Sequence, residues 1–216
     1  MIVFTLFISS QAAARDDFQY WSQYSFKLYD GKKFDWITFG EFRVKEDAHK
    51  VGLYYISERL VFDLWEHLSL GFNYTYLNTR KTSSGINDDY KFQHRLEGEV
   101  NPHWDLTDWL KLHIRNRAEF RWIEDNGSYN TRLRQRWTFT VPVKSAGFLK
   151  SLYFGNEFIY NIAEHEYNEN RTVPLGAQFT INDKTSFSLF YMIQSQKGTN
   201  DWSSNQILGT LVSVKF

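Results

Sequence analysis

The chain has 216 residues, 19% of them aromatic and none of them cysteine, and its 25 basic and 25 acidic side chains cancel to a formal net charge of zero. The length is that of one domain, the lack of cysteine excludes a disulfide framework and thiol chemistry, and the balanced charge gives no overall field to attract nucleic acid. So many aromatic residues at a mean hydropathy of −0.51 are typical of a transmembrane β-barrel, which has an apolar outer face and a polar inner face.

The first 14 residues have the pattern of an export signal. Residues 1–8 form a short apolar run that leads into Ala12, Ala13 and Ala14, small residues of the kind found at signal-peptide cleavage sites. The run is shorter than the roughly 20 apolar residues of a membrane-spanning helix. No basic residue precedes it, so either the true signal starts further upstream or this is a mature N-terminus with an unusual tail. We expect the first, with residues 1–14 as signal peptide and residues 15–216 as the barrel domain.

From residue 18 onward, apolar and polar residues alternate along most of the chain. Because successive side chains of a strand point to opposite faces, this period of two indicates strands with one apolar and one polar face. In residues 110–122, for example, Leu112 and Ile114 lie on one side while Arg115 and Arg117 lie on the other. The alternation predicts strands near residues 17–29, 34–45, 51–65, 68–79, 90–103, 110–122, 130–143, 151–162, 171–181, 185–196 and 206–216.

The predicted strands describe an all-β, antiparallel up-and-down transmembrane barrel. Eleven segments are visible, but single-chain bacterial barrels have an even number of strands. We therefore expect 10–12 strands, with twelve favoured, and a misplaced boundary in residues 17–65, where Glu58 interrupts an apolar face. Short connections alternate with long polar ones at residues 80–89, 163–170 and 197–205, as periplasmic turns alternate with outer loops.

The last predicted strand ends on an aromatic residue. Residues 206–216 place Leu208, Val212, Val214 and Phe216 on one face. This segment resembles the terminal strand of outer-membrane barrels, in which a final aromatic residue is read by the barrel assembly machinery. We therefore interpret Phe216 as an assembly signal, and we expect a bacterial outer-membrane location with membrane lipids and the assembly machinery as partners.

Several strand motifs together resemble a known family. The motifs include Gly71-Phe72-Asn73-Tyr74, Phe92 to Glu97 (FQHRLE), Arg115-Asn116-Arg117 and Arg132 to Arg136 (RLRQR), with Tyr20-Trp21 and Glu41-Phe42-Arg43 before them. In this order they are similar to an outer-membrane β-barrel family catalogued as a bacterial domain of unknown function. The resemblance covers nearly all of the expected mature chain. It implies the barrel fold, and it brings no activity and no catalytic residues.

The polar faces of residues 90–136 carry a concentration of charge. A charged side chain that faces lipid at the midplane costs about 2–4 kcal/mol, so these side chains must point into the lumen. The predicted lumen-lining residues are Arg95, Glu97, Glu99, His113, Arg115, Arg117, Glu119, Arg121, Arg132, Arg134 and Arg136.

Three functions are compatible with such a lumen. A narrow arginine-lined channel would pass small anionic solutes, because guanidinium groups suit carboxylate and phosphate. A sealed structural or adhesive barrel would have Arg–Glu pairs filling its lumen. A lipid-modifying enzyme would need a nucleophile; His113 could pair with Glu97 or Glu99 as a base, but no serine lies beside it. The channel ranks above the enzyme, activity as an enzyme is not favoured, and we assign no catalytic residue.

Metal, cofactor and nucleic-acid functions have no support in the sequence. The segment Glu164-His165-Glu166 places three ligand types together, but neighbours on an irregular loop do not define a coordination geometry. We therefore expect no metal, no cofactor and no nucleic-acid partner.

The charges also predict how two strands pair. Residues directly opposite in an antiparallel pair share a face, so opposite charges are expected to meet. A turn across residues 105–109 sets a register in which each ion pair is complementary. The acids of these two strands are then used up, so the arginines of residues 132–136 are expected to lack enough acidic partners. The predicted partners are Glu99 with Arg115, Glu97 with Arg117, Arg95 with Glu119 and Gln93 with Arg121.

Overall fold

The computed structural model describes residues 17–80, 89–124, 129–144, 147–199 and 201–216. The expected signal peptide, residues 1–14, lies outside these ranges, as does most of the predicted loop at residues 80–89. The described residues contain no helix long and apolar enough to span a membrane.

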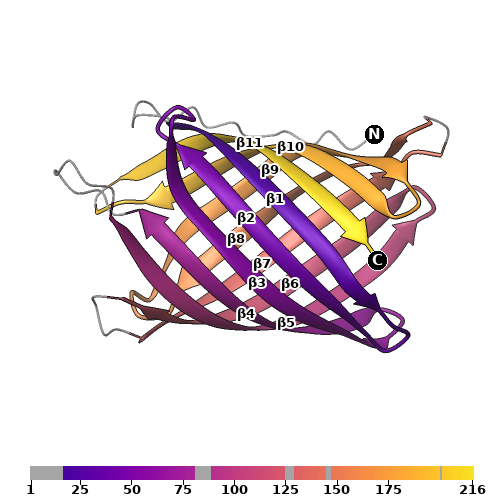
Figure 1. Cartoon of the computed structure of the whole chain (residues 1–216), viewed down its shortest axis with the longest axis horizontal. Helices are drawn as coiled ribbons and strands as arrows, with labels where there is room; N and C mark the ends of the chain where they lie inside the picture. Colours follow the sequence, from indigo (N-terminus) through magenta and orange to yellow (C-terminus); the bar gives the residue numbers. More distant parts are fainter. Residues whose placement is uncertain (1–16, 81–88, 125–128, 145–146, 200) are drawn as a thin grey trace.

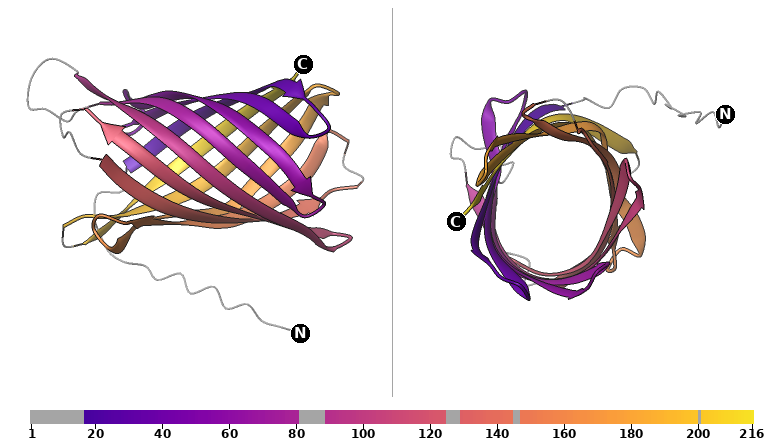
Figure 2. Two further views of the ribbon diagram at one scale, coloured as in Figure 1. Left: turned by 90° about the horizontal axis from the view of Figure 1, so that it is seen from below. Right: turned by 90° about the vertical axis from the view of Figure 1, so that its right-hand side faces the viewer.

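The described chain forms eleven strands that close into one barrel (Figures 1 and 2). Each strand pairs with its neighbours in chain order, and the ring is completed between the first and the last. The strands are β1 (Asp17–Asp30), β2 (Phe34–Lys45), β3 (Lys50–Trp65), β4 (Leu68–Arg80), β5 (Tyr90–Thr107), β6 (Leu110–Ile123), β7 (Tyr129–Pro142), β8 (Leu149–Asn161), β9 (Glu166–Asn182), β10 (Thr185–Lys197) and β11 (Trp202–Lys215).

The expectation of twelve strands, all antiparallel, is wrong. Ten of the neighbouring pairs are antiparallel, but β1 and β11 run parallel, with Asp17 opposite Asn205 and Lys27 opposite Lys215. The parallel pair follows from the count, because each hairpin reverses the chain and an odd number of strands leaves the first and last pointing the same way. The eleven segments visible in the alternation were therefore the strands themselves.

Three strands extend four or five residues beyond their predicted bounds into segments that were expected to be loops or turns. β9 begins at Glu166 and β11 at Trp202, while β5 continues to Thr107. The added residues are polar or mixed, but they have pairing partners: Asn161 of β8 lies opposite Glu166, and Gln196 of β10 lies opposite Glu169. Pairing with a neighbour satisfies the backbone hydrogen bonds of these residues, so their polarity does not end the strand.

The two faces of the barrel differ sharply in polarity. Large apolar side chains cover the outside, where Phe72 is 58% exposed and Leu96 and Leu175 are at least half exposed. The inside is largely polar and charged, and Glu119 there is completely buried at 0% exposure. The polarity is thus the reverse of that in a water-soluble domain.

Polar side chains on the outer face bond to one another. Glu58, which interrupts the apolar alternation, accepts hydrogen bonds from Trp36 Nε1 at 2.7 Å and from Thr38 Oγ1 at 3.0 Å. The Glu58 position lies directly opposite Thr38 in regular β2–β3 pairing. The interruption in residues 17–65 therefore marks a satisfied polar group on an ordinary strand.

Candidate functional site

The candidate site is the charged inner wall formed by β5 to β9. The register of β5 and β6 decides which of its charges lie opposite each other. Arg95 lies opposite Arg121, and Glu99 lies opposite Arg117. Glu97 lies opposite Glu119, so two pairs of like charges face each other directly. The predicted register was wrong by two residues. The difference arises at the turn, where β5 runs on to Thr107 and the pairing shifts irregularly before it reaches Leu110.

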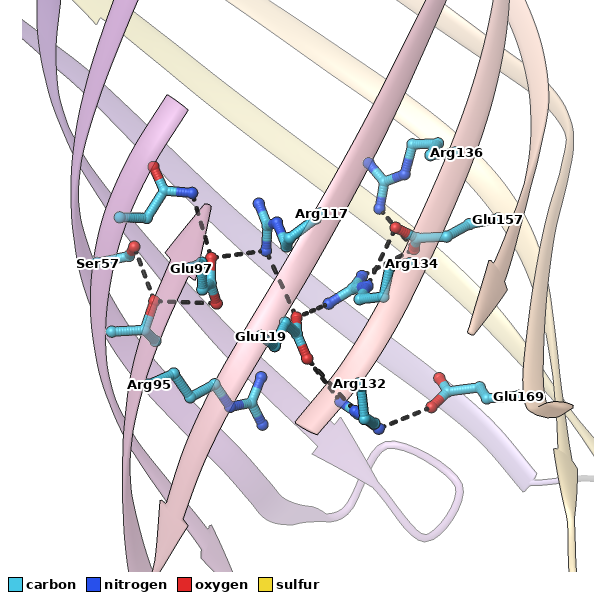
Figure 3. A network of polar contacts seen from close by, with 12 residues as sticks. Ser57, Arg95, Glu97, Arg117, Glu119, Arg132, Arg134, Arg136, Glu157 and Glu169 are labelled. Carbon is cyan, nitrogen blue, oxygen red and sulfur yellow. Dashed lines mark hydrogen bonds and ion pairs between the residues drawn. The ribbon is translucent and has the colours of Figure 1, made fainter. Parts of the chain in front are cut away.

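Diagonal ion pairs compensate for the like charges. Arg117 Nη1 lies 2.9 Å from Glu97 Oε2 and 3.7 Å from Glu119 Oε1, so one guanidinium bridges the two opposed glutamates. Arg117 also contacts Glu99, with Nε donating to Oε1 at 2.5 Å. The alternating charges of β5 and β6 therefore form a ladder in which Arg117 contacts the directly opposite Glu99, the diagonal Glu97 and Glu119 of its own strand; Figure 3 shows the last two contacts.

The arginines of β7 are held by acids from both sides. Arg134 donates to Glu119 Oε1 at 2.5 Å and to Glu157 Oε2 at 2.8 Å (Figure 3). Arg132 reaches Glu119 at 3.2 Å and Glu169 at 3.7 Å, and Arg136 reaches Glu157 at 2.9 Å. The expectation that these arginines lack acidic partners is wrong.

Glu157 and Glu169 are two acidic residues of the wall that the sequence did not predict. Glu157 lies on β8 and binds Arg115 at 2.7 Å in addition to the β7 arginines. Its position in the alternation of residues 151–162 could have placed it inward. Glu169 falls in a segment expected to be a loop, so no signal in the strand pattern pointed to it.

Two arginines of the wall remain without an acidic partner. Among the described residues, neither Arg95 nor Arg121 forms an ion pair; Arg95 donates only to Gln93 Oε1, at 2.9 and 2.7 Å. The Nε of Arg121 is buried without a hydrogen-bond partner. Because the two arginines lie opposite each other, they concentrate uncompensated positive charge at one place on the wall.

A smaller cluster lies on β1, β2 and β9, and its residues were not among those predicted to line the lumen. The Arg43 guanidinium stacks 3.5 Å from the centre of the Trp21 ring, and it contacts Glu41 of its own strand. Arg171 of β9 lies 5.3 Å from the same ring, and Glu41 accepts a hydrogen bond from Gln23 at 2.5 Å. These contacts connect β2 and β9 across the seam between β1 and β11.

His113 lies apart from the carboxylates with which it was considered. It lies opposite His103 in the register, with the two ring centres 6.3 Å apart. Among the contacts of the described residues, His113 has no hydrogen bond to Glu97 or Glu99. No group of three or more metal-ligating side chains is found in the described ranges, so the segment around His165 forms no such cluster there.

Comparison with known proteins identifies the family of the chain. Residues 18–205 match the model of a family described as a protein of unknown function, DUF2490. The chain belongs to this family. The resemblance to a family of unknown function is thereby confirmed. No curated protein and no solved structure matches the chain.

A cavity of about 760 Å³ lies inside the barrel of this DUF2490 protein. Residues of all eleven strands line it, and its volume falls within the range of about 300–1,000 Å³ for small-molecule sites. Several predicted lumen residues are in the lining: Arg95, Glu97, Arg115, Arg117, Arg121, Arg132, Arg134 and Arg136. The predicted residues Glu99 and Glu119 contact these arginines from the same wall.

Phe216 lies one residue past the end of β11. The residue is 68% exposed, and its backbone N–H donates to the carbonyl of Lys27 on β1 at 3.2 Å. The aromatic residue is therefore accessible next to the closing seam of the barrel.

Proposed function

We propose that this DUF2490 protein spans a bacterial outer membrane and provides an anion pathway through its lumen. The observation that carries the proposal is the reversed polarity, together with Arg95 and Arg121 inside, which form no ion pair with any described residue. A closed barrel satisfies its backbone hydrogen bonds without a free edge, which is a requirement for a structure surrounded by lipid. An apolar outer face would contact acyl chains, while outward charges would be costly.

Aromatic residues near the short turns support the proposed location in a membrane. Trp65 is 71% exposed, and Trp36, Trp104 and Trp109 are also exposed near turns at the same end of the barrel. Tryptophan favours the membrane interface, because one part of the ring system is apolar and the N–H is polar. Residues 1–14 would direct export, and the terminal Phe216 would be read by the assembly machinery.

The lumen favours anions because its cations exceed its acids. The charged residues lining the cavity are four glutamates and twelve basic side chains. Even with the nearby Glu99 and Glu119, acids remain in the minority. An excess of fixed positive charge in a narrow passage attracts anions and repels cations.

The sealed structural barrel is the second candidate, and the ion-pair network favours it. Arg117 and Arg134 are each bound by more than one glutamate, which keeps these side chains in place within the lumen. Conductance separates the two candidates, because a sealed barrel passes no ions. The lipid-modifying enzyme receives no support from the position of His113.

The test is the single-channel conductance of the purified barrel in planar bilayers under a KCl gradient. We expect ion-conducting events whose reversal potential shows preference for chloride. Arg121→Glu should shift the reversal potential toward potassium, because it reverses a charge in the lumen. Lys32→Glu is the matched control, since Lys32 is exposed in the turn before β2. Absence of conductance, or equal shifts in the two variants, would contradict the proposal.

A further inference from the structure

The cavity in the lumen has two unlike walls. The charged wall of β5 to β9 is described above. The remaining strands contribute most of the apolar lining. The apolar side chains on that side are Trp21, Phe39, Leu53, Leu77, Phe190, Met192 and Leu211, and they lie alongside the charged Glu41, Arg43, Lys45 and Arg59.

An apolar wall is unnecessary for the passage of a small hydrated anion. Apolar surface in contact with water costs about 25 cal/mol per Å², and a polar lining would avoid that cost. Some of the apolar side chains pack together, since Trp21, Phe190 and Met192 form a buried cluster with Ile207. Leu53 and Leu77 lie outside that cluster and still line the cavity. Leu53 is 7% and Leu77 is 3% exposed, so they offer a small apolar surface to a hydrocarbon group.

The charged wall offers an anion site at Arg95 and Arg121. Arg121 is only 9% exposed, lines the cavity and has a buried Nε without a partner. Arg95 lies directly opposite it and forms no ion pair among the described residues; Figure 3 draws no contact between Arg95 and the glutamates labelled there. Two neighbouring guanidinium groups repel each other, and a bound anion would remove that repulsion while accepting charge-assisted hydrogen bonds.

We propose that the lumen contains a binding site for an amphiphilic carboxylate, with its head group at Arg95 and Arg121 and its hydrocarbon body against Leu53 and Leu77. The inference rests on the proposed function, because the ligand must enter the lumen as an anion. The cavity volume of about 760 Å³ limits the ligand to the size of a compact small molecule. The two walls together select for molecules that carry both a negative charge and an apolar group.

The site is tested by isothermal titration calorimetry on the full barrel in a non-ionic detergent. Three probes separate the two parts of the ligand: 4-phenylbutyrate has both, acetate has only the charge, and 4-phenylbutyramide has only the apolar body. We expect saturable binding of one 4-phenylbutyrate per barrel. Acetate and the neutral amide should each bind at least about tenfold more weakly, since each loses one set of contacts.

Variants locate the binding site. Arg121→Gln and Arg95→Gln should each weaken 4-phenylbutyrate binding at least about tenfold, and using both guards against one variant failing to fold. Lys32→Gln removes a positive charge outside the lumen and should leave binding unchanged. Unchanged binding in both arginine variants would overturn the proposed site.

The outcomes also separate this inference from the proposed function. If 4-phenylbutyrate binds no more tightly than acetate while the conductance remains anion-selective, the amphiphile site is refuted and the anion pathway stands. If the amide binds as tightly as 4-phenylbutyrate, the head-group assignment is refuted. If the barrel neither conducts ions nor binds any of the probes, the proposed function fails together with the inference.

Discussion

Arg134 and Arg121 both project into the lumen, but they differ in their partners. Arg134 is bound by Glu119 and Glu157, and Glu119 is completely buried. Arg121 has no ion pair among the described residues and lies opposite Arg95. Two chemically identical substitutions at these positions should therefore have different effects on stability.

We predict that Arg134→Gln lowers the free energy of unfolding by about 3–5 kcal/mol, because it removes the buried cation that bridges two buried carboxylates. Arg121→Gln should change the free energy of unfolding by less than about 1 kcal/mol, since it breaks no ion pair and removes a like-charge contact. Urea unfolding of the detergent-folded barrel, followed by tryptophan fluorescence, measures both. Equal losses in the two variants would show that the ion-pair network does not hold the wall together.

At the scale of elements, the parallel pairing of β1 and β11 is the feature that distinguishes this barrel from the expected even-stranded one. Phe18 lies opposite Gln206, and Phe26 lies opposite Val214. If the two strands were antiparallel, Phe18 would instead lie near Val214, and Phe26 near Gln206. The chain has no native cysteine, so introduced pairs report the direction without interference.

We predict disulfide formation in the double variants Phe18→Cys/Gln206→Cys and Phe26→Cys/Val214→Cys after mild oxidation. The crossed pairs Phe18→Cys/Val214→Cys and Phe26→Cys/Gln206→Cys are the matched controls and should remain reduced, because a disulfide cannot bridge Cα atoms more than about 7 Å apart. Gel mobility with and without reductant gives the readout. Cross-linking of the crossed pairs alone would establish an antiparallel seam.

The end of β11 gives a second prediction for this element. Phe216 is exposed, and its only hydrogen bond among the described residues runs from its backbone N–H to Lys27. Replacing it with aspartate should therefore cost the folded barrel less than about 1 kcal/mol. We predict that Phe216→Asp strongly reduces the amount of assembled protein in cells but leaves refolding in detergent nearly unchanged. Lys215→Asp, one residue earlier, controls for charge alone. Normal cellular levels of Phe216→Asp would contradict its role as an assembly signal.

At the scale of the whole molecule, closure leaves no free sheet edge. Every strand pairs on both sides, so local unfolding at one strand must break two ladders. We predict that unboiled samples migrate differently from boiled samples on a denaturing gel, because the closed barrel resists detergent until it is heated. Identical mobility before and after boiling would indicate that the ring opens readily.

The sequence by itself determined which face each strand residue occupies. Alternation is a local property with a period of two, so Arg95, Glu97, Arg117 and Arg134 could be placed on one wall from the sequence alone. The same local pattern revealed the eleven segments, and the motifs placed the chain in its family. Twelve strands were expected only because single-chain bacterial barrels generally have an even number of strands.

Only the tertiary structure decided which charges meet. The β5–β6 register depends on an irregularity near Asp105, which no alternation encodes, and it places Glu97 opposite Glu119. The partners of Arg134 come from strands on both sides, so they depend on several registers at once. The position of Arg121 opposite Arg95, where it forms no ion pair with a described residue, is likewise decided by the register. Pairing between strands is non-local, and a shift of two residues keeps every side chain on its face while it exchanges every partner.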